Sequence, residues 1–200
     1  VAIFLVIFFP KVTHSSVSFD GADDYLDCGT GVALFKDELT LSAWIKYTYI
    51  LEPAQRGTII SRYNDSAAML NAELYLDADI LGFGYTDLIC DILDSGVTLQ
   101  SNVTAGISDT DWHHVSCIFD GTTITNYIDG VSQGSLYVGN PMSIDSGPTF
   151  IGAQANSPQY YFTGEISDVG VYTHALSQSE LETLAFSRKR AYVIPTDWGG

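Results

Sequence analysis

Basic residues are scarce in this chain. Eight lysines and arginines stand against 24 aspartates and glutamates among 200 residues, which leaves a formal net charge of −16 at pH 7. Proteins that bind nucleic acid or an anionic membrane surface neutralise phosphates with lysine and arginine, so we expect neither partner. The acidic balance suits calcium, which takes hard oxygen ligands, but it is equally typical of a surface that only keeps a protein soluble.

Cysteines are also few. Cys28, Cys90 and Cys117 allow at most one internal disulfide and leave a free thiol. Their spacing matches no zinc motif, so neither a disulfide scaffold nor a structural zinc site is predicted, and the redox compartment stays open. We interpret Cys117 as a core thiol that packs like a small hydrophobic side chain.

The apolar run at residues 1–9, VAIFLVIFF, is too short to cross a bilayer, which takes about twenty residues. It is either the end of a signal peptide, a buried strand stopped by Pro10, or an arm that docks on a neighbouring subunit. We expect the buried strand first and the arm second. In the second interpretation the candidate assembly residues are Phe4, Phe8, Phe9 and, at the other end, Trp198.

Familiar catalytic patterns are missing. The sequence contains no G-x-S-x-G, no H-E-x-x-H and no Gly-rich phosphate loop. The stretch DWHHVSCIFDG (111–121) groups histidine, cysteine and carboxylates, but alternate residues of a strand face opposite sides. His113 and His114 therefore point apart and cannot share a metal ion. We expect His113 to reach a backbone group of a loop.

The sequence is rich in short runs with strand character, separated by turn residues. Leu39, Leu41, Ala43 and Ile45 alternate along residues 38–48, which places them on one face of a strand. Asp120-Gly121 and Asp129-Gly130 lie between such runs and predict hairpins. Further strands are predicted at residues 16–20, 24–29, 57–63, 72–78, 80–89, 113–119, 122–128, 131–138, 149–153, 160–164 and 166–172. Residues 95–111 predict a short strand plus a loop.

One helix is predicted near the C-terminus, within residues 175–187. Ser177 is a suitable N-cap and Glu180 follows three residues later, which is a capping box. Leu181, Leu184 and Ala185 form one apolar stripe. Strands at intervals of about 8–12 residues, with this single helix, predict an all-β antiparallel sandwich of two sheets.

Five segments, in order, resemble the laminin-G-like or concanavalin-A-like jelly-roll lectin domains, close to the pentraxin branch. They are VSFDGADDYLDCG, LTLSAWIK, GTIISRYND, DWHHVSCIFDGTTITNYIDG and FIGAQANSPQYYFTGEISDVGVYTHALSQSEL. The resemblance implies a jelly roll at residues 15–186, with an N-terminal strand or arm at 1–14 and a tail at 187–200. It also implies binding of glycans or proteins, often with calcium.

Carboxylates near both ends of this domain are the candidate calcium ligands. Asp20, Asp23 and Asp24 share a tight turn, and adjacent carboxylates repel each other unless a cation or hydrogen bonds offset the repulsion. The resemblance implies help from a closing G-x-I-D-E segment, where this chain has Glu165 and Asp168 instead. The alternative is that Asp20 caps the turn while the other two are solvated.

Binding rather than catalysis is the predicted function. Glucanases of this fold need paired carboxylates on one strand, as in E-x-D-x-E, and the sequence lacks that pattern. Tyr160 and Tyr161 are the candidate ligand-binding residues, since aromatic rings stack on sugars. We expect a non-enzymatic carbohydrate- or protein-binding module with calcium as the candidate cofactor, located outside the cell, on its surface or on a virion. The alternative is a structural subunit of a phage particle or surface assembly, a homo-oligomer docked through its apolar termini.

Overall fold

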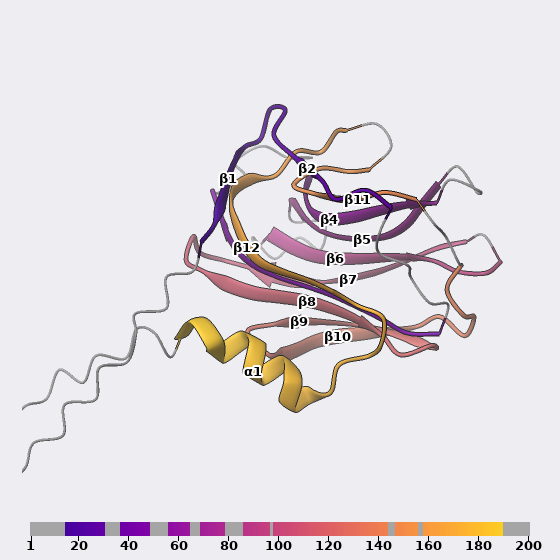
Figure 1. Cartoon of the computed structure of the whole chain (residues 1–200). Coiled ribbons are helices and arrows are strands. Elements are labelled where there is room, and N and C mark those ends of the chain that lie inside the picture. Colours follow the sequence, from indigo (N-terminus) through magenta and orange to yellow (C-terminus); the bar gives the residue numbers. More distant parts are fainter. Residues whose placement is uncertain are drawn as a thin grey trace, which may run out of the picture.

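The strands of the chain pack as two layers, face to face (Figure 1). The computed structural model describes residues 15–30, 37–48, 56–64, 69–78, 86–96, 98–143, 147–155 and 158–189. Sheet A contains, in spatial order, β1 (Val17–Asp20), β12 (Thr163–Tyr172), β3 (Leu39–Tyr47), β8 (His113–Phe119), β9 (Thr123–Ile128) and β10 (Val131–Tyr137). Sheet B contains β2 (Leu26–Asp27), β11 (Thr149–Ile151), β4 (Arg56–Asn64), β5 (Met69–Ala78), β6 (Thr86–Leu93) and β7 (Leu99–Ile107). All pairings are antiparallel, which confirms the predicted jelly-roll sandwich.

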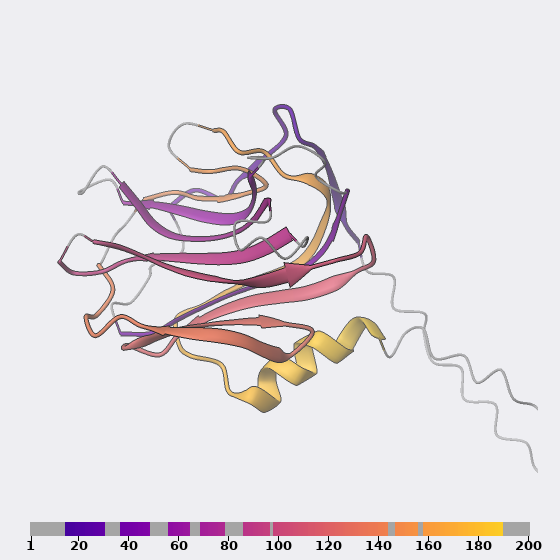
Figure 2. The ribbon, with the colours of Figure 1, turned by 180° about the vertical axis from the view of Figure 1, so that it is seen from behind.

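The core lies between the inner faces of the two sheets. Figure 2 shows the same two layers from behind. On β3 the predicted face of Leu39, Leu41, Ala43 and Ile45 is buried in this core. The neighbouring strand β8 and the facing strands β5 and β6 contribute their own alternate residues, because successive side chains of a strand point to opposite sides. Those residues are Leu74 and Leu76 on β5, Leu88, Cys90 and Ile92 on β6, and Val115, Cys117 and Phe119 on β8.

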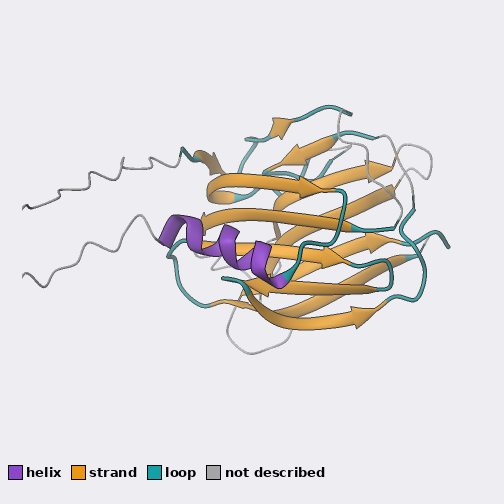
Figure 3. Cartoon of the chain, turned by 60° about the horizontal axis from the view of Figure 1, so that its bottom comes forward, coloured by secondary structure: helices purple, strands orange, loops and turns teal. Residues whose placement is uncertain are grey.

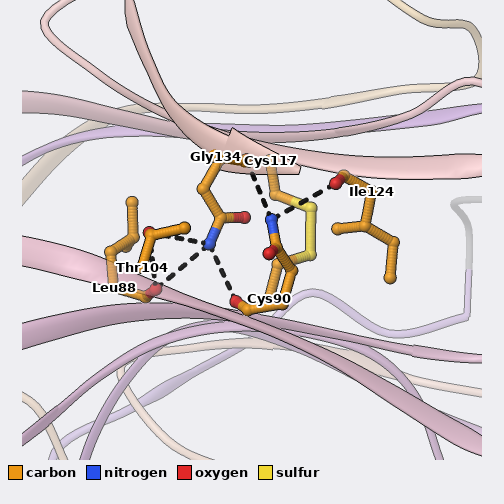
Figure 4. Close-up of a disulfide and its surroundings, with 8 residues drawn as sticks. Leu88, Cys90, Thr104, Cys117, Ile124 and Gly134 are labelled. Atoms are coloured by element: carbon orange, nitrogen blue, oxygen red, sulfur yellow. Dashed lines mark hydrogen bonds between the residues drawn. A yellow bond between two sulfur atoms is a disulfide. The ribbon is translucent and has the colours of Figure 1, made fainter. Parts of the chain in front are cut away.

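A disulfide crosses this core between Cys90 of β6 and Cys117 of β8 (Figure 4). The prediction that Cys117 is a free core thiol is therefore wrong, although its burial is confirmed. Both side chains point inward from facing sheets, with Cα atoms 6.1 Å apart, which lies within the range that a disulfide spans. Cys28 is the free, exposed cysteine.

Buried amides surround this bridge. The Asn126 side chain donates to the Leu88 and Asn102 carbonyls at 3.1 and 2.9 Å. Asn102 donates in turn to the carbonyls of Ile124 and Gly134 at 3.2 and 3.1 Å. These hydrogen bonds satisfy polar groups that would otherwise be buried at a cost of about 1–3 kcal/mol each, and they tie β6, β7, β9 and β10 together.

Two strand predictions are wrong. Residues 95–111 were predicted as a short strand and a loop, but β7 runs for nine residues, because its polar Asn102 and Thr104 point inward to buried partners. Residues 160–164 and 166–172 were predicted as separate strands, but the single strand β12 spans Thr163–Tyr172. A Cβ at Gly164, where φ is +139°, would lie 2.2 Å from the Lys46 carbonyl oxygen, so only glycine lets β12 approach β3 this closely.

The hairpin and helix predictions are confirmed. Asp129 and Gly130 both have positive φ, 53° and 79°, as a two-residue type I′ turn requires. Helix α1 (Gln178–Lys189) is preceded by the capping box, in which the Ser177 N–H donates to the Glu180 carboxylate at 2.8 Å. The helix lies across the outer face of sheet A (Figure 3), where Leu181 packs on Ile118 and the Trp44 indole donates to the Leu184 carbonyl.

Candidate functional site

Three carboxylates gather in the turn between β1 and β2. One ligand oxygen each from Asp20, Asp23 and Asp24 lies within 4.8 Å of the others, and all three residues are exposed. Asp20 accepts a hydrogen bond from the Ala22 N–H at 2.8 Å, and Asp24 accepts one from the Asp20 N–H at 3.1 Å. The turn thus closes on its own carboxylates and leaves several of their oxygens open to solvent. We call these three residues the acidic turn.

Glu165 and Asp168, the other two candidate ligands, do not belong to this group of three. Thr163, not Glu165, is the β12 residue opposite Asp20. Glu165 stands two residues further along, about 7 Å away, and accepts a hydrogen bond from the Ser16 hydroxyl at 2.7 Å. Asp168 sits at an irregularity of β12, with φ of 50°, and accepts from the Ser167 hydroxyl.

A pocket of about 400 Å³ adjoins the acidic turn. It opens where β1, β12 and β3 meet the loop between β7 and β8. Ser18, Glu165 and Lys46 form one row across the three strands, and the row of Asp20 and Thr163 comes next on the same face. The lining consists of Ser18, Phe19, Lys46, Tyr47, Thr48, Thr110, Gly164 and Glu165. It combines hydroxyls, one exposed cation and one carboxylate.

The loop that carries Thr110 is held by His113. The His113 Nδ1 lies 3.0 Å from an Asp129 oxygen, and its Nε2 lies 2.9 Å from an Asp109 oxygen. The expectation that His113 contacts a backbone group is therefore wrong, since both partners are carboxylates. The hydrogen bond to Asp129 raises the pKa of His113, burial of the ring opposes this, and the bond to Asp109 raises the pKa further. The bond from His113 also lowers the pKa of Asp109.

His114 points the other way, which confirms that the two histidines cannot share a metal. Its ring lies under α1 on the outer face of sheet A, 5.7 Å from the Trp44 ring. Burial lowers its pKa to about 4, because an imidazolium would lose its hydration there. His114 is therefore a neutral packing residue.

Tyr160 and Tyr161 lie in the loop before β12 and differ in exposure. Tyr160 is 43% exposed and has φ of 53°, an uncommon backbone conformation for a non-glycine residue. The Arg56 guanidinium lies 4.9 Å from its ring centroid, and the Thr58 N–H donates to its carbonyl. Tyr161 is half-buried, and its hydroxyl donates to the Pro158 carbonyl at 2.9 Å.

A family model described as the Concanavalin A-like lectin/glucanases superfamily matches residues 20–182. The chain belongs to this superfamily. Among curated proteins, none matches it.

Solved structures of several proteins share the fold at low sequence identity. A native heptameric SAP-like pentraxin from Limulus polyphemus is 20% identical, with a TM-score of 0.66 over 85% of this chain and 81% of that one. The CBM40 of the Ruminococcus gnavus IT-sialidase, bound to α2,3-sialyllactose, is 15% identical, with a TM-score of 0.64 over 86% and 98%. The botulinum neurotoxin serotype D ligand binding domain, in complex with N-acetylneuraminic acid, is 14% identical, with a TM-score of 0.61 over 86% and 42%.

A buried polar cluster on the outer face of sheet B was not predicted from the sequence. Glu73 is fully buried, pairs with Arg56, and accepts hydrogen bonds from the Thr58 hydroxyl at 2.7 Å and the Gln154 amide at 3.2 Å. Burial raises the pKa of Glu73 to about 7, against the opposing effect of Arg56. The alternation in AELYLDA was a usable signal, since it puts Glu73 beside Tyr75, whose ring lies 3.6 Å from the Arg56 guanidinium carbon.

The predicted assembly residues Phe4, Phe8, Phe9 and Trp198 lie outside the described residues. In the part of the chain that the structure describes, no helix is both long and apolar enough to cross a membrane.

Proposed function

We propose that this chain is a non-enzymatic carbohydrate-binding module that holds its glycan at the corner formed by the acidic turn and the adjoining pocket. The observation that carries the proposal is the position of Asp20, one of three grouped and exposed carboxylates, one residue row away from a row that lines a 400 Å³ pocket with several hydroxyls. Sugar hydroxyls are both donors and acceptors, so they pair well with such a mixed polar lining. Membership of a superfamily that contains lectins supports the proposal.

Calcium fits the acidic turn, and Asp20, Asp23 and Asp24 would hold it. Three carboxylates offer up to six hard oxygens, of which one on Asp20 and one on Asp24 already accept backbone hydrogen bonds. Calcium takes six to eight oxygen ligands, so this set would leave coordination positions for water or ligand. When bound, the ion would offset the repulsion among the carboxylates and offer those positions to sugar oxygens.

An acidic sugar is the ligand class that the pocket favours. Lys46 is the cationic side chain of the lining and is exposed, so a sugar carboxylate has a counter-ion there. Two fold neighbours were solved with sialic acid ligands, α2,3-sialyllactose and N-acetylneuraminic acid. We therefore propose a sialylated glycan as the ligand of this corner.

The buried carboxylates on sheet B support a binding role rather than catalysis. Glu73 and Asp91 stand opposite each other on β5 and β6, a pairing that would suit general acid–base chemistry. Their exposed fractions are 0% and 2%, however, and Glu73 is already paired with Arg56. A substrate therefore has no direct access to them.

Isothermal titration with α2,3-sialyllactose, with and without calcium, tests the proposal. We expect binding in calcium and about tenfold weaker binding after chelation or in Asp23→Asn, since the loss of one calcium ligand is worth about 1.4 kcal/mol or more. Asp37→Asn, an exposed aspartate outside the acidic turn, is the matched control and should bind like the wild type. Lys46→Gln should weaken the binding of α2,3-sialyllactose, because the sugar carboxylate loses its counter-ion. Absence of binding to this ligand and to every sugar of a glycan array, in both conditions, refutes the proposed function.

A further inference from the structure

The loop between β7 and β8 is tied to the rest of the sandwich through one imidazole ring. His113, the first residue of β8, contacts Asp109 within the loop at 2.9 Å and Asp129 in the β9–β10 turn at 3.0 Å. Asp129 is itself fixed, because its other oxygen accepts the His114 N–H at 3.0 Å and its own N–H donates to the His114 carbonyl at 2.7 Å. The ring therefore joins a rigid turn to an exposed loop.

The geometry identifies the form of the ring. Both partners are carboxylates, which accept hydrogen bonds when ionised, and a neutral imidazole has one N–H to donate. Two hydrogen bonds to two carboxylates therefore require the doubly protonated imidazolium. Loss of one proton leaves a ring nitrogen lone pair facing a carboxylate oxygen at about 3 Å, a repulsive contact that the exposed partner, Asp109, relieves most easily by moving away.

The oxygen of Asp109 that contacts His113 has a second role. The same Oδ1 accepts the Asp111 N–H at 2.8 Å, which closes a tight turn around Thr110. Thr110 is one of the residues that line the pocket beside the acidic turn. The position of this pocket wall therefore depends on the bond between Asp109 and His113.

We propose that His113 is a positioning residue of the pocket: as an imidazolium it holds the Asp109–Asp111 turn against the sandwich, and ligand binding weakens when it loses its proton. The effect on ligand binding rests on the proposed function, but the effect of His113 protonation on the Asp109–Asp111 turn is independent of that function. The charged groups that act on His113 are Asp109 and Asp129. From β3, the residue opposite His113 is Ile45, which is uncharged, and the next residue, Lys46, is exposed.

The sign of the effect follows from these partners. Both carboxylates stabilise the protonated ring, so the pKa of His113 lies above the value of about 6.5 for a free imidazole. The turn is then held at pH values below this raised pKa while the carboxylates stay ionised, and it is released as the pH rises through the raised pKa. The affinity for a ligand that contacts Thr110 should depend on pH in the same way.

The structural part is tested by NMR without any ligand. We expect the ring nitrogens of His113 to titrate above about pH 6.5, and the Thr110 amide to exchange faster, after correction for intrinsic exchange, once His113 is neutral. Asp109→Asn keeps an oxygen for the Asp111 N–H but removes the charge, so it should lower the pKa of His113 and speed Thr110 exchange at pH values between the pKa of the variant and that of the wild type. Asp120→Asn is the matched control, since Asp120 closes a similar turn with the Thr122 N–H and, among the residues that the structure describes, is hydrogen-bonded to no histidine ring. Titration of His113 at or below about 6.5, or Thr110 exchange unaffected by Asp109→Asn, overturns the proposal.

The functional part uses α2,3-sialyllactose at saturating calcium from about pH 5.5 to about pH 8.5. The wild-type affinity should fall by about fivefold over this range, a typical coupling, while His113→Gln should bind weakly with a flat profile. Parallel wild-type and His113→Gln profiles overturn the role of His113 in binding. If α2,3-sialyllactose fails to bind at every pH, the proposed function fails for this ligand, and Thr110 exchange alone decides whether His113 positions the turn.

Discussion

Cys90 and Cys117 join the two sheets of the sandwich covalently, with Cα atoms 6.1 Å apart across the core. Their sequence separation of 27 residues closes a loop that contains β7 and the start of β8. Such a bridge restricts the unfolded chain and fixes the spacing of the layers. It also suits an oxidising environment, where structural disulfides persist.

Removal of this bridge should destabilise the protein strongly. The double variant Cys90→Ala/Cys117→Ala should lose about 2–4 kcal/mol of unfolding free energy, measured by urea denaturation, because the loop is no longer closed in the unfolded state. Cys28→Ser is the control, since Cys28 is exposed and free, and should change stability by less than about 0.5 kcal/mol. Equal stability of the double variant and the wild type would show that the bridge adds nothing to folding.

Substitution of Gly164 should disrupt the pairing of β12 with β3. In Gly164→Ala the new Cβ would meet the backbone of Lys46 and Tyr47 at 2.2 and 2.7 Å, at a φ of +139°, so we expect a loss of about 3 kcal/mol. Gly29→Ala is the matched control, because Gly29 has φ of +67° but no atom of the described residues lies within 4 Å of a Cβ there, and it should lose about 1 kcal/mol. Thermal unfolding separates the two, and similar losses would contradict the close approach.

His114 should make the fold sensitive to acid. Its pKa is about 4 in the folded chain, against about 6.5 when unfolded, so the unfolded state binds the proton more readily. Its contribution is complete above about pH 6.5 and is lost as the pH falls toward about 4, up to about 3 kcal/mol. Unfolding free energies of the wild type and His114→Gln over this range test this. The unfolding free energy of the wild type should fall more steeply with decreasing pH than that of His114→Gln. Identical slopes would refute the contribution of His114.

Removal of either charge of the Glu73–Arg56 pair should lower the stability of the protein. Glu73→Gln leaves Arg56, packed between the rings of Tyr75 and Tyr160, without its counter-ion. Loss of one partner of a fully ionised buried pair costs about 3 kcal/mol, but burial raises the pKa of Glu73 to about 7, so at neutral pH, where Glu73 is partly neutral, we expect a smaller loss of about 1 kcal/mol. Glu182→Gln, on the exposed side of α1, is the control and should stay within about 0.5 kcal/mol of the wild type. A denaturation midpoint of Glu73→Gln equal to that of the control would contradict the expectation.

Much of the fold was predictable because its signals are local. Leu39, Leu41, Ala43 and Ile45 alternate within nine residues, and Asp129-Gly130 specifies its turn by backbone preference alone. The disulfide was not predictable, because three cysteines allow several pairings and the sequence does not say which strands face each other. The full length of β7 was not predictable, because polar residues such as Asn102 and Thr104 are typical of loops and their buried partners are not visible in the sequence.

The candidate site likewise has a part that the sequence predicts and a part that it does not. Asp20, Asp23 and Asp24 are adjacent in sequence, so their grouping was readable directly. Lys46, Thr110 and Glu165 come from three distant segments and meet only through the register of β1, β12 and β3 and the path of one loop. Register depends on the pairing of whole strands, which no single segment reveals.

The pairing of β1 with β12 has a consequence for how the site forms. Ser16 and Glu165, which are hydrogen-bonded at this edge, are separated by 149 positions in sequence. Contacts of such long range form late in folding, because a large loop must close first. A fragment that stops before Thr163 would retain the acidic turn but lack the neighbouring strand that completes the pocket. Capture of a glycan at this corner would therefore report that the whole domain has folded, and the corner cannot be transplanted as a short peptide.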